Sequence, residues 1–434
     1  MNIFLTGQCT LHWGRMEFGN IGNYYILEPL IRFLHKKFPD SYICTTFQLS
    51  ESFCSREKVT VLPMEYYYGW DEDISKGEEE YSIAMHYSQT GELIKTTPFI
   101  AQLLNSDLFI DFSGDIWGEN ADFLGADRFQ VGLYKDKVAQ LLGKKTAMIC
   151  GSPGPIPAIS EQFAKEVYSG FDLVTNREPL STIELKNRGF DISKTKDVAC
   201  PAFCFEPSEF NAIENLPQVS DFIKSNRPKI GIVICGWNFL IGPFDKWPRD
   251  DADYLPFVNE IEVISSKIDA DFILMSHSNG FPIPPAKFQL QHGRDYPIIK
   301  QLHTILEQRG KVKNVKTFDG VYDAWQTKAI IGQFDLFISG RVHAAVAALS
   351  QHVPTVIIDY GHEPKAHKLR GFAAVAEVTD FVADPQISGE ISEKTLFAWN
   401  TRRQYTAHLQ NRIPKVKEMA ESTFNLLKDI CDDQ

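Results

Sequence analysis

The segment Ser339-Gly340-Arg341-Val342-His343 places a guanidinium and an imidazole where a helix is expected to begin. It follows the apolar run Asp335–Ile338, a predicted strand, and leads into the alanine-rich stretch Ala344–Leu349. The free N–H groups and the dipole of a first helical turn favour an anion, and the planar fork of Arg341 matches a carboxylate or phosphate. We therefore predict an anion site at Arg341 and His343. A surface ion pair for Arg341 and a satisfied, partly buried imidazole for His343 are the alternatives.

A local excess of positive charge continues through residues 341–371. Its cations are Arg341, Lys365, Lys368 and Arg370, against the acids Asp359 and Glu363. The whole chain carries a net charge of -12, so this excess indicates focused binding of an anionic ligand. We expect Lys365 and Lys368 to contribute to it. Histidines in this segment could bind a metal, but no cysteine or paired carboxylate lies at a useful spacing, and we predict no metal site.

Further short loops of small and polar residues follow predicted strands. They are Gly19–Asn23, Ser113–Asp115, Gly151–Pro155 and His277–Gly280. Ligands of open parallel sheets bind beyond the carboxyl ends of the strands, where small residues let the backbone approach. We expect these loops to line the cleft side of the site through Asn20, Asn23, Gly114, Ser152 and His277.

The elements that must position these residues alternate between short apolar strands and helices. Predicted strands are Ile3–Leu5, Ile43–Phe47, Leu108–Phe112, Thr146–Cys150, Leu173–Val174, Ile230–Cys235, Phe272–Met275, Val315–Thr317, Leu336–Ile338 and Thr355–Ile358. Predicted helices include 23–37, 252–267, 295–309, 322–333 and 341–350. This alternation predicts parallel sheets with right-handed crossovers.

The proline-broken stretch 206–228 interrupts this alternation, which indicates a domain crossing. We predict two Rossmann-like domains, residues 1–215 and 225–390, whose parallel sheets face a cleft. Residues 391–434 should add a C-terminal segment, with a long helix over 393–429 that crosses back. The acidic stretch 71–80 (DEDISKGEEE) is expected to be a solvated surface insertion.

Composition excludes several classes of protein. The acidic balance argues against nucleic acid or an anionic membrane surface as the main partner. Eight cysteines without a C-x-x-C pair are expected to be reduced and mostly buried. The first residues lack a signal-peptide pattern, and no apolar run approaches the ~18 residues of a membrane span. We therefore expect a cytoplasmic protein without a transmembrane segment; the sequence leaves its oligomeric state open.

Several of these segments together resemble the polysaccharide pyruvyl transferase family. The strongest likeness is FDLFISGRVHAAVAALSQHVPTV over 334–356 with the following KLRGF over 368–372. Upstream, Arg177-Glu-Pro-Leu-Ser181, DVACPAF over 197–203, the Gly151–Pro155 turn and His277 are also similar to that family. Departures are Gly22-Asn23 in place of Gly-Asp, and Ser113-Gly114-Asp115 in place of a run of glycines, both on the presumed acceptor side.

The resemblance implies a glycosyltransferase-B-like architecture and an activity. Such enzymes transfer the carboxyethylidene group of phosphoenolpyruvate onto two hydroxyls of a sugar, as in exopolysaccharide biosynthesis, and form a pyruvate ketal. On this basis Arg177 and Arg341 would bind the donor from the two domains, and His343 would protonate it. Asp115 would orient or deprotonate the acceptor hydroxyl, with a loop-capping role as the alternative, and the loops with Asn20, Asn23, Gly114, Ser152 and His277 would line the acceptor side. No cofactor is implied beyond phosphoenolpyruvate as donor. The acceptor would be a sugar or a lipid-linked oligosaccharide.

Two other functions remain open at this point. A nucleotide-sugar glycosyltransferase of the same architecture would also keep a phosphate at a helix N-terminus in the second domain, so the fold does not separate the two. A sugar-binding homologue without turnover is the second alternative. An oxidoreductase is disfavoured because no G-x-G-x-x-G follows the first strand.

Overall fold

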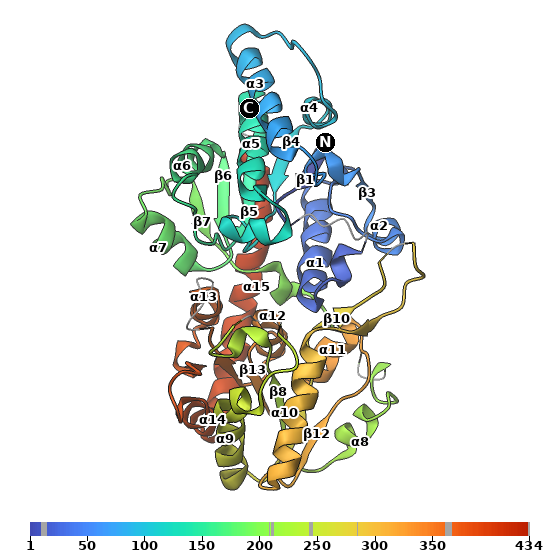
Figure 1. Cartoon of the computed structure of the whole chain (residues 1–434), viewed down its shortest axis with the longest axis vertical. Coiled ribbons are helices and arrows are strands. Elements are labelled where there is room, and N and C mark those ends of the chain that lie inside the picture. The colour runs from blue at the N-terminus through green and yellow to red at the C-terminus, as the bar shows by residue number, and fades with distance from the viewer. Residues whose placement is uncertain are drawn as a thin grey trace. The chain divides into compact units, whose positions relative to one another are not determined.

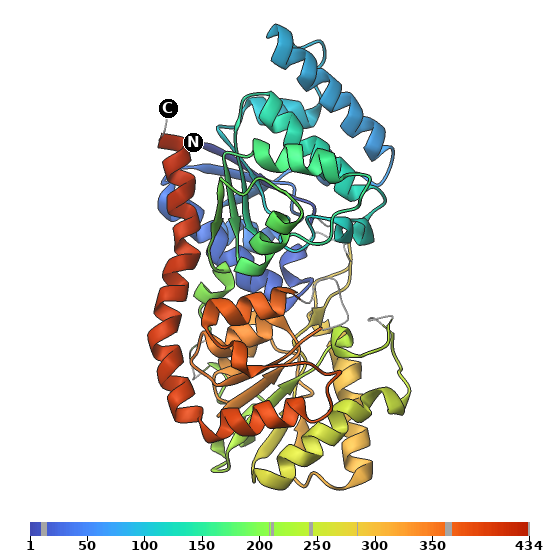
Figure 2. The same ribbon diagram turned by 90° about the vertical axis from the view of Figure 1, so that its left-hand side faces the viewer.

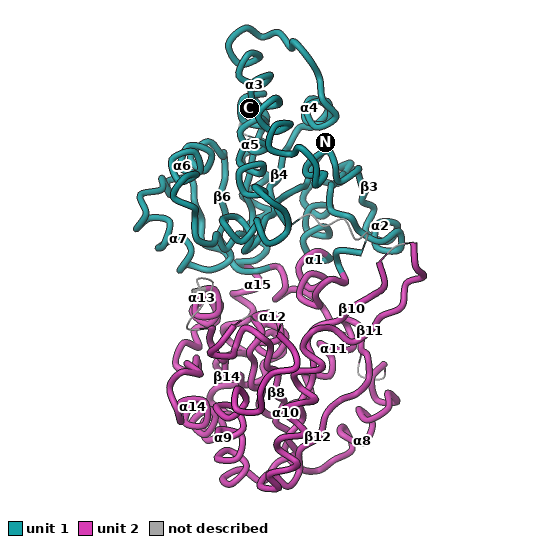
Figure 3. The backbone as a smooth tube through the Cα atoms, in the orientation of Figure 1, with its two compact units in different colours: residues 1–17, 28–200, 419–434 teal, residues 18–27, 201–418 magenta. Residues whose placement is uncertain are grey.

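The computed structural model describes residues 1–9, 15–207, 209, 212–242, 246–283, 285–360 and 367–432. Tertiary contacts divide the chain into two compact units, coloured separately in Figure 3. Unit 1 comprises Met1–Glu17, Glu28–Cys200 and Met419–Gln434, and unit 2 comprises Phe18–Leu27 and Pro201–Glu418. Each unit is built around its own parallel sheet.

Unit 1 contains a parallel sheet of seven strands in the order β3-β2-β1-β4-β5-β6-β7. The strands are β1 (Asn2–Thr6), β2 (Tyr42–Thr45), β3 (Val59–Val61), β4 (Leu108–Asp111), β5 (Lys145–Gly151), β6 (Leu173–Asn176) and β7 (Thr195–Asp197). The strand order reverses between β1 and β4, which pair in register from Ile3 with Leu108 to Thr6 with Asp111. Ligand crevices of such sheets open at the carboxyl ends of the strands that flank this reversal.

The helices of unit 1 are the C-terminal part of α1 (Ile21–Lys37), α2 (Glu51–Glu57), α3 (Asp73–Thr90), α4 (Pro98–Leu104), α5 (Arg128–Leu141), α6 (Glu161–Gly170) and α7 (Pro179–Asn187). Side chains cap the start of α2, α4 and α7. Ser50 caps α2 and Thr97 caps α4, each accepting a bond from a backbone N–H of the first turn. Glu178 does the same for α7 from the loop that carries Arg177.

The stretch 71–80, expected to be a solvated surface insertion, is exposed at six of its ten residues, but most of it belongs to α3, which packs along α5 (Figure 1). Asp73, Gly77 and Glu80 recur at helical spacing, so they share one buried face. Glu80 Oε2 accepts a hydrogen bond from Lys135 Nζ at 2.5 Å, and both side chains are buried. Pairing with a lysine of α5 thus allows a carboxylate of this stretch to be buried.

Unit 2 contains a second parallel sheet, of six strands in the order β12-β9-β8-β13-β14-β15. The strands are β8 (Lys229–Val233), β9 (Asp271–Leu274), β12 (Val315–Thr317), β13 (Leu336–Ser339), β14 (Thr355–Ile358) and β15 (Val382–Ala383). A small antiparallel pair, β10 (Asn279–Gly280) and β11 (Gln291–His292), lies outside it. Here the strand order reverses between β8 and β13, which pair from Leu336 with Ile230 to Ser339 with Val233.

The helices of unit 2 follow the predicted alternation closely. They are α8 (Val219–Lys224), α9 (Asp251–Lys267), α10 (Asp295–Arg309), α11 (Ala324–Ile331), α12 (Val342–Leu349), α13 (His367–Ala376), α14 (Glu390–Asn400) and the first part of α15 (Arg402–Asp432). The two parallel sheets with their helices confirm the predicted α/β class. Of the elements missed, β3, β7 and β15 have two or three residues at sheet edges, too few to show a period.

The C-terminal region differs from the single helix predicted over 393–429. Two helices, α14 and α15, are separated at Thr401, and α15 is the long red helix of Figure 2. Its residues up to Glu418 cluster with unit 2 and those from Met419 with unit 1. In unit 2 the Tyr405 hydroxyl donates to the Thr355 carbonyl at 2.8 Å.

The division of the chain also falls earlier than the predicted boundary at residue 215. Residues Pro201–Glu418 cluster with unit 2, because the short 3-10 helix Pro201–Cys204 contacts α12.

All eight cysteines are free thiols, and five of them are buried. No helix within the described ranges combines the length and apolar character that a bilayer crossing requires.

Candidate functional site

In unit 2, Arg341 lies where the sheet order reverses, directly beyond β13. It is the N-cap residue of α12, with an extended backbone (φ -120°, ψ 129°). The Ser339 hydroxyl holds this turn, donating to the Arg341 carbonyl at 2.9 Å and accepting from the Arg341 N–H at 3.3 Å. The strand–helix junction predicted from the sequence is therefore confirmed, and it places Arg341 at the carboxyl end of the sheet.

The guanidinium of Arg341 is already bound by a buried carboxylate. Its Nε donates to Asp295 Oδ2 at 3.0 Å and its Nη2 donates to Asp295 Oδ1. Asp295 is fully buried at the start of α10, and its N–H donates to Ser278 Oγ at 2.9 Å. Burial alone would lower the pKa of Arg341, but the charge of Asp295 outweighs it and raises the pKa. Arg341 thus forms a buried bidentate ion pair, whereas the alternative to an anion site was a surface ion pair, and Asp295 uses two of its five N–H donors.

His343 is in the first turn of α12 and packs against a glycine of α1. A Cβ at Gly22 would lie only 2.3 Å from His343 Nδ1, so only glycine fits beside this imidazole. The His343 ring also meets the Phe372 ring of α13 edge-on, at 6.1 Å between centroids. His343 is half-buried, and α12 with the start of α1 fixes its position.

This packing reassigns the loop Gly19–Asn23, which the sequence placed on the acceptor side of the first domain. Residues Phe18–Leu27 cluster with unit 2. The Asn20 side chain caps the start of α1 by accepting from the Gly22 N–H at 3.0 Å, and the Asn23 N–H donates to the Asn20 carbonyl at 2.9 Å. Asn20 and Asn23 thus stand at the helix start that contacts His343.

His277 follows β9 and is fully buried. Its ring meets Tyr25 edge-on at 5.5 Å, and neither ring nitrogen has a hydrogen-bond partner among the described residues. Burial, reinforced by the positive charge of Arg341, lowers the pKa of His277 to about 3. The imidazole is therefore neutral near pH 7, where it can accept or donate a hydrogen bond but is not a ready proton source.

The turn beyond β8 contains a residue that the sequence did not reveal. Asn238 is fully buried; its Oδ1 accepts from the Cys235 N–H at 2.9 Å and its Nδ2 donates to the Ile358 carbonyl at 3.3 Å. A Cβ at Gly340 would lie 1.9 Å from Asn238 Oδ1, so Gly340 is required for this close packing. Asn238 thereby ties the ends of β8, β13 and β14 together beside Arg341.

The other predicted cations follow β14, in or before α13. Lys365 lies outside the described residues. Lys368 is half-buried in the first turn of α13. Arg370 is exposed and donates through Nε to the buried Asp359. Within the described ranges, no three His, Cys, Asp or Glu side chains are grouped as a metal ion requires.

In unit 1, three of the predicted residues meet at the carboxyl end of the sheet. Arg177, after β6, is buried and donates from Nε to Ser152 Oγ at 2.9 Å, and its Nη2 lies 3.6 Å from Asp115 Oδ1. The Ser152 N–H donates to the Gly114 carbonyl at 2.8 Å, which docks the two loops on each other. Gly114 has φ +62°, a conformation that favours glycine. Asp115 is therefore an ion-pair partner of Arg177 as well as a loop residue.

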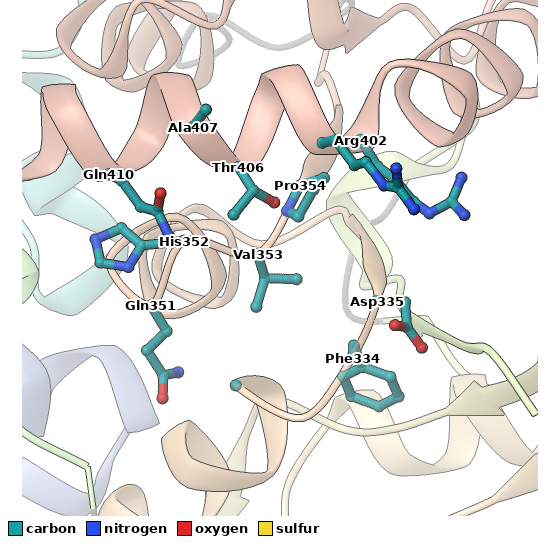
Figure 4. A pocket seen from close by; sticks show the side chains of 12 residues that line it. Phe334, Asp335, Gln351, His352, Val353, Pro354, Arg402, Thr406, Ala407 and Gln410 are labelled. Atoms are coloured by element: carbon teal, nitrogen blue, oxygen red, sulfur yellow. The ribbon is translucent and has the colours of Figure 1, made fainter. Parts of the chain in front are cut away.

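A cavity of about 520 Å³ in unit 2 lies away from these residues (Figure 4). Residues that precede β13 and β14, including Phe334, His352 and Pro354, line it together with Arg402 and Thr406 of α15. It therefore opens at the amino ends of these strands, whereas Arg341 follows their carboxyl ends. Sequence reasoning assigned none of these lining residues to the site.

Three solved structures resemble the chain over nearly its full length. A glycosyltransferase from Rickettsia africae has a TM-score of 0.58 at 12% identity, covering 100% of this chain and 99% of that one. UDP-GlcNAc 2-epimerase from Neisseria meningitidis, bound to UDP-GlcNAc, has a TM-score of 0.56 at 11% identity, with 99% and 100% covered. Anabaena Alr3699/HepE, in complex with UDP and glucose, has a TM-score of 0.53 at 12% identity, with 98% of each chain covered. These likenesses show a glycosyltransferase-B-like α/β fold.

Comparison of the sequence identifies the family more specifically than the fold does. No curated protein matches the sequence. A family model, polysaccharide pyruvyl transferase, matches residues 20–362. This range includes the Arg177 loop of unit 1 and the strand–helix junction with Arg341 and His343 in unit 2. The chain belongs to the polysaccharide pyruvyl transferase family.

Proposed function

We propose that the protein transfers the carboxyethylidene group of phosphoenolpyruvate onto two hydroxyls of a sugar, in a polysaccharide or its precursor, and releases phosphate. The observation that carries this proposal is the family match over residues 20–362, within which Arg341 and His343 occupy the ligand end of a parallel sheet. We further propose that the reaction takes place in the cytoplasm, on a sugar or a lipid-linked oligosaccharide.

The donor is a small dianion or trianion, with a phosphate and a carboxylate on a three-carbon frame. Asp295 accepts hydrogen bonds from two of the five N–H groups of Arg341, one on Nε and one on Nη2. The two N–H groups of Nη1 are not used by Asp295. The α12 N-terminus adds a favourable dipole, and Lys368 begins the neighbouring α13. A charge-assisted contact of this kind contributes roughly 1.5–3 kcal/mol. Arg177 remains a further candidate on the family resemblance, and Lys365 on the local excess of positive charge in the sequence.

The reaction needs one proton delivered and two hydroxyl protons removed. A proton added to the methylene carbon of phosphoenolpyruvate makes its central carbon electrophilic, and a first sugar hydroxyl adds there and loses its proton. The C–O bond to phosphate then breaks, and the second hydroxyl closes the ketal, losing its proton. His343 is the proposed acid. Asp115 is the proposed group that orients or deprotonates a hydroxyl. Neutral His277 is the proposed hydrogen-bond partner for a reacting oxygen.

Phosphate release from phosphoenolpyruvate, measured with a panel of sugar acceptors, tests this function. We expect acceptor-dependent release that persists in excess EDTA, because the proposed site uses cationic side chains and no metal or cofactor. Calorimetry distinguishes the alternatives. Tight binding of a UDP- or GDP-sugar without a response to phosphoenolpyruvate would identify a glycosyltransferase. Binding of sugars without turnover of either donor would identify a sugar-binding homologue.

A further inference from the structure

Unit 1 buries two carboxyl groups that interact with each other. Asp111 is the last residue of β4, where the strand order reverses, and Asp136 lies on α5; both are fully buried, and each affects the pKa of the other. The proposed reaction uses neither of them. Two charged carboxylates without a cation between them are costly in a protein interior, so this pair requires an explanation.

Asp111 is connected to the loop beyond β4. Its Oδ2 accepts from the Ser113 hydroxyl at 2.9 Å, and Ser113 Oγ in turn accepts from the Gln8 N–H at 2.9 Å. Hydrogen bonds of Ser113 therefore hold the loop 113–115 to one oxygen of Asp111 and to the backbone that follows β1. Ser113 precedes Gly114 and Asp115, the residue that faces Arg177. A change in the charge of Asp111 thus acts directly on the loop that carries Asp115.

The remaining carboxyl oxygens form no hydrogen bond of normal length. Asp111 Oδ1 and both oxygens of Asp136 have no such partner among the described residues, although the buried N–H of Trp117 lies near enough to lower the pKa of Asp136 in part. A carboxylate only accepts hydrogen bonds, whereas a protonated carboxyl group also donates one. One proton placed on Asp136 therefore supplies the donor that Asp111 Oδ1 requires. The side chain of Gln8 packs on Gly132, one helical turn before Asp136, so its amide extends the same polar cluster.

Other titratable groups surround the pair. Tyr67 is buried nearby, Cys9 follows β1, and Asp115 is in the loop beyond β4; they add no positive charge. The cation is Arg128 at the start of α5. It donates from Nε to the Gln8 carbonyl at 2.7 Å and from Nη1 to the Leu124 carbonyl at 3.0 Å, so it points at backbone oxygens. Burial raises the pKa of Asp111 to about 7, and burial together with Asp111 raises the pKa of Asp136 well above its ordinary value.

We propose that Asp111 and Asp136 hold one proton between them in the folded protein, and that this carboxyl–carboxylate pair positions the Ser113–Asp115 loop. Asp136 carries the proton and donates it as a hydrogen bond to Asp111, which accepts from Ser113 with its other oxygen. When the pair loses its proton to solvent, two adjacent negative charges repel each other and the loop shifts. The two aspartates are positioning residues; their effect on the acceptor rests on the proposed function, but the shared proton does not.

Stability as a function of pH tests the shared proton without any substrate. A carboxyl whose pKa is raised on folding destabilises the fold increasingly as pH rises from the unfolded value, near 3.9, through the folded one. The contribution of the pair to the folding equilibrium constant should therefore fall by up to about tenfold per pH unit as pH rises toward 7, and the difference between wild type and variant measures it. Because neutral His277 contributes in the opposite direction over much of this range, Asp111→Asn and Asp136→Asn should each make stability rise more steeply with pH than in the wild type. An Asn side chain at either position can still hydrogen-bond to the remaining carboxylate, so both variants should fold.

Asp40→Asn is the matched control, because Asp40 is an exposed residue of unit 1 at φ +62°, which asparagine also tolerates. It should leave the pH dependence unchanged. Infrared spectra of the folded wild type at pH 7 should show a protonated carboxyl band that disappears in Asp136→Asn. A wild type without that band, or single variants with an unaltered pH dependence of unfolding, would overturn the proposal.

Kinetics then connect the pair to the site. If the proposed transfer is observed, Asp136→Asn should change the pH profile of the KM for the sugar acceptor more than the KM for phosphoenolpyruvate. If the acceptor profile is unchanged while the stability and infrared results are as expected, the pair shares a proton but does not position the acceptor loop. Absence of any transfer would contradict the proposed function and leave the stability and infrared tests of the shared proton intact.

Discussion

Asp295 binds the guanidinium of Arg341 through both of its carboxylate oxygens, and the pair is buried in unit 2. The bond joins the first turn of α10 to the N-cap of α12, so it fixes the most prominent cation of the site in one orientation. The same ion pair neutralises the positive charge of Arg341. An incoming anion therefore meets a rigid ion pair supported by a helix dipole, instead of a free guanidinium.

This pairing predicts an asymmetric effect on stability. Asp295→Ala should lower the free energy of unfolding by about 3–5 kcal/mol, because it leaves a buried charge without a partner. The double substitution Asp295→Leu with Arg341→Met should recover much of this loss, since it removes both charges. Urea unfolding of the three proteins measures the effect. A double variant as unstable as Asp295→Ala would show that the ion pair itself, rather than the unpaired charge, dominates.

Substitutions of His343 should separate catalysis from binding. If His343 protonates the methylene carbon, His343→Ala should reduce turnover by roughly 10²–10⁴-fold with a much smaller loss of donor affinity. His343→Asn should be nearly as slow, because an amide cannot deliver a proton to carbon. Steady-state rates and calorimetry measure the two effects. His352→Asn is the control: His352 follows α12 at φ +65°, by the amino end of β14, and should retain activity. Near-normal turnover of His343→Asn would exclude the acid role.

Gly22 should be intolerant of even a methyl group. In Gly22→Ala the new Cβ would meet the His343 imidazole at 2.3 Å, so either α1 or His343 must move. We expect a loss of about 1–3 kcal/mol in stability and a fall in turnover. Gly69→Ala provides the comparison, since its Cβ would meet no atom closer than 3.4 Å. Adding His343→Ala to Gly22→Ala should restore part of the stability, because it removes the imidazole contacts but leaves the Cβ of residue 343 at 2.9 Å; no recovery at all would mean that the imidazole clash is not the cause.

The buried His277 predicts a specific dependence of stability on pH. Its pKa is depressed to about 3 in the folded state against about 6.5 unfolded, so the stabilisation is full above pH ~6.5 and is lost as pH falls toward the folded value. Replacing His277 by Leu should lower the number of protons taken up on unfolding by up to one in that pH range. Nuclear magnetic resonance of the wild-type ring should show no titration near pH 6.5, and a midpoint there would contradict the neutral state.

The buried pair of Glu80 and Lys135 should contribute much more to stability than an exposed one. Lys135→Ala leaves Glu80 buried without its cation and should cost about 3–5 kcal/mol. Lys95→Ala removes the exposed pair with Glu79, which has the same 2.5 Å separation, and should cost no more than about 1 kcal/mol. Urea unfolding compares the two variants. Equal losses would mean that burial does not set the difference.

Local sequence patterns determined the elements and the ends of the strands at which the site residues lie. The junction of β13 and α12 was predictable because an apolar run, a Ser-Gly turn and an alanine-rich helix are all encoded within fifteen residues. Helix α10 was predicted with its observed bounds, Asp295–Arg309, for the same reason. The alternation of such elements also sufficed for two parallel sheets, since parallel neighbours need a crossover between them.

Tertiary structure alone decided which side chains meet. Asp295 and Arg341 are 46 residues apart, and nothing near Asp295 distinguishes it from an ordinary first-turn aspartate. Gly22 lies beside His343, and Asp111 beside Asp136, only because helices pack at specific places against sheets whose order is not sequential. Periodicity is a property of neighbouring residues, so the sequence displays it directly. The effect of a buried charge or of an absent Cβ depends on residues that are distant in the sequence. Only the folded structure shows which distant residues are in contact.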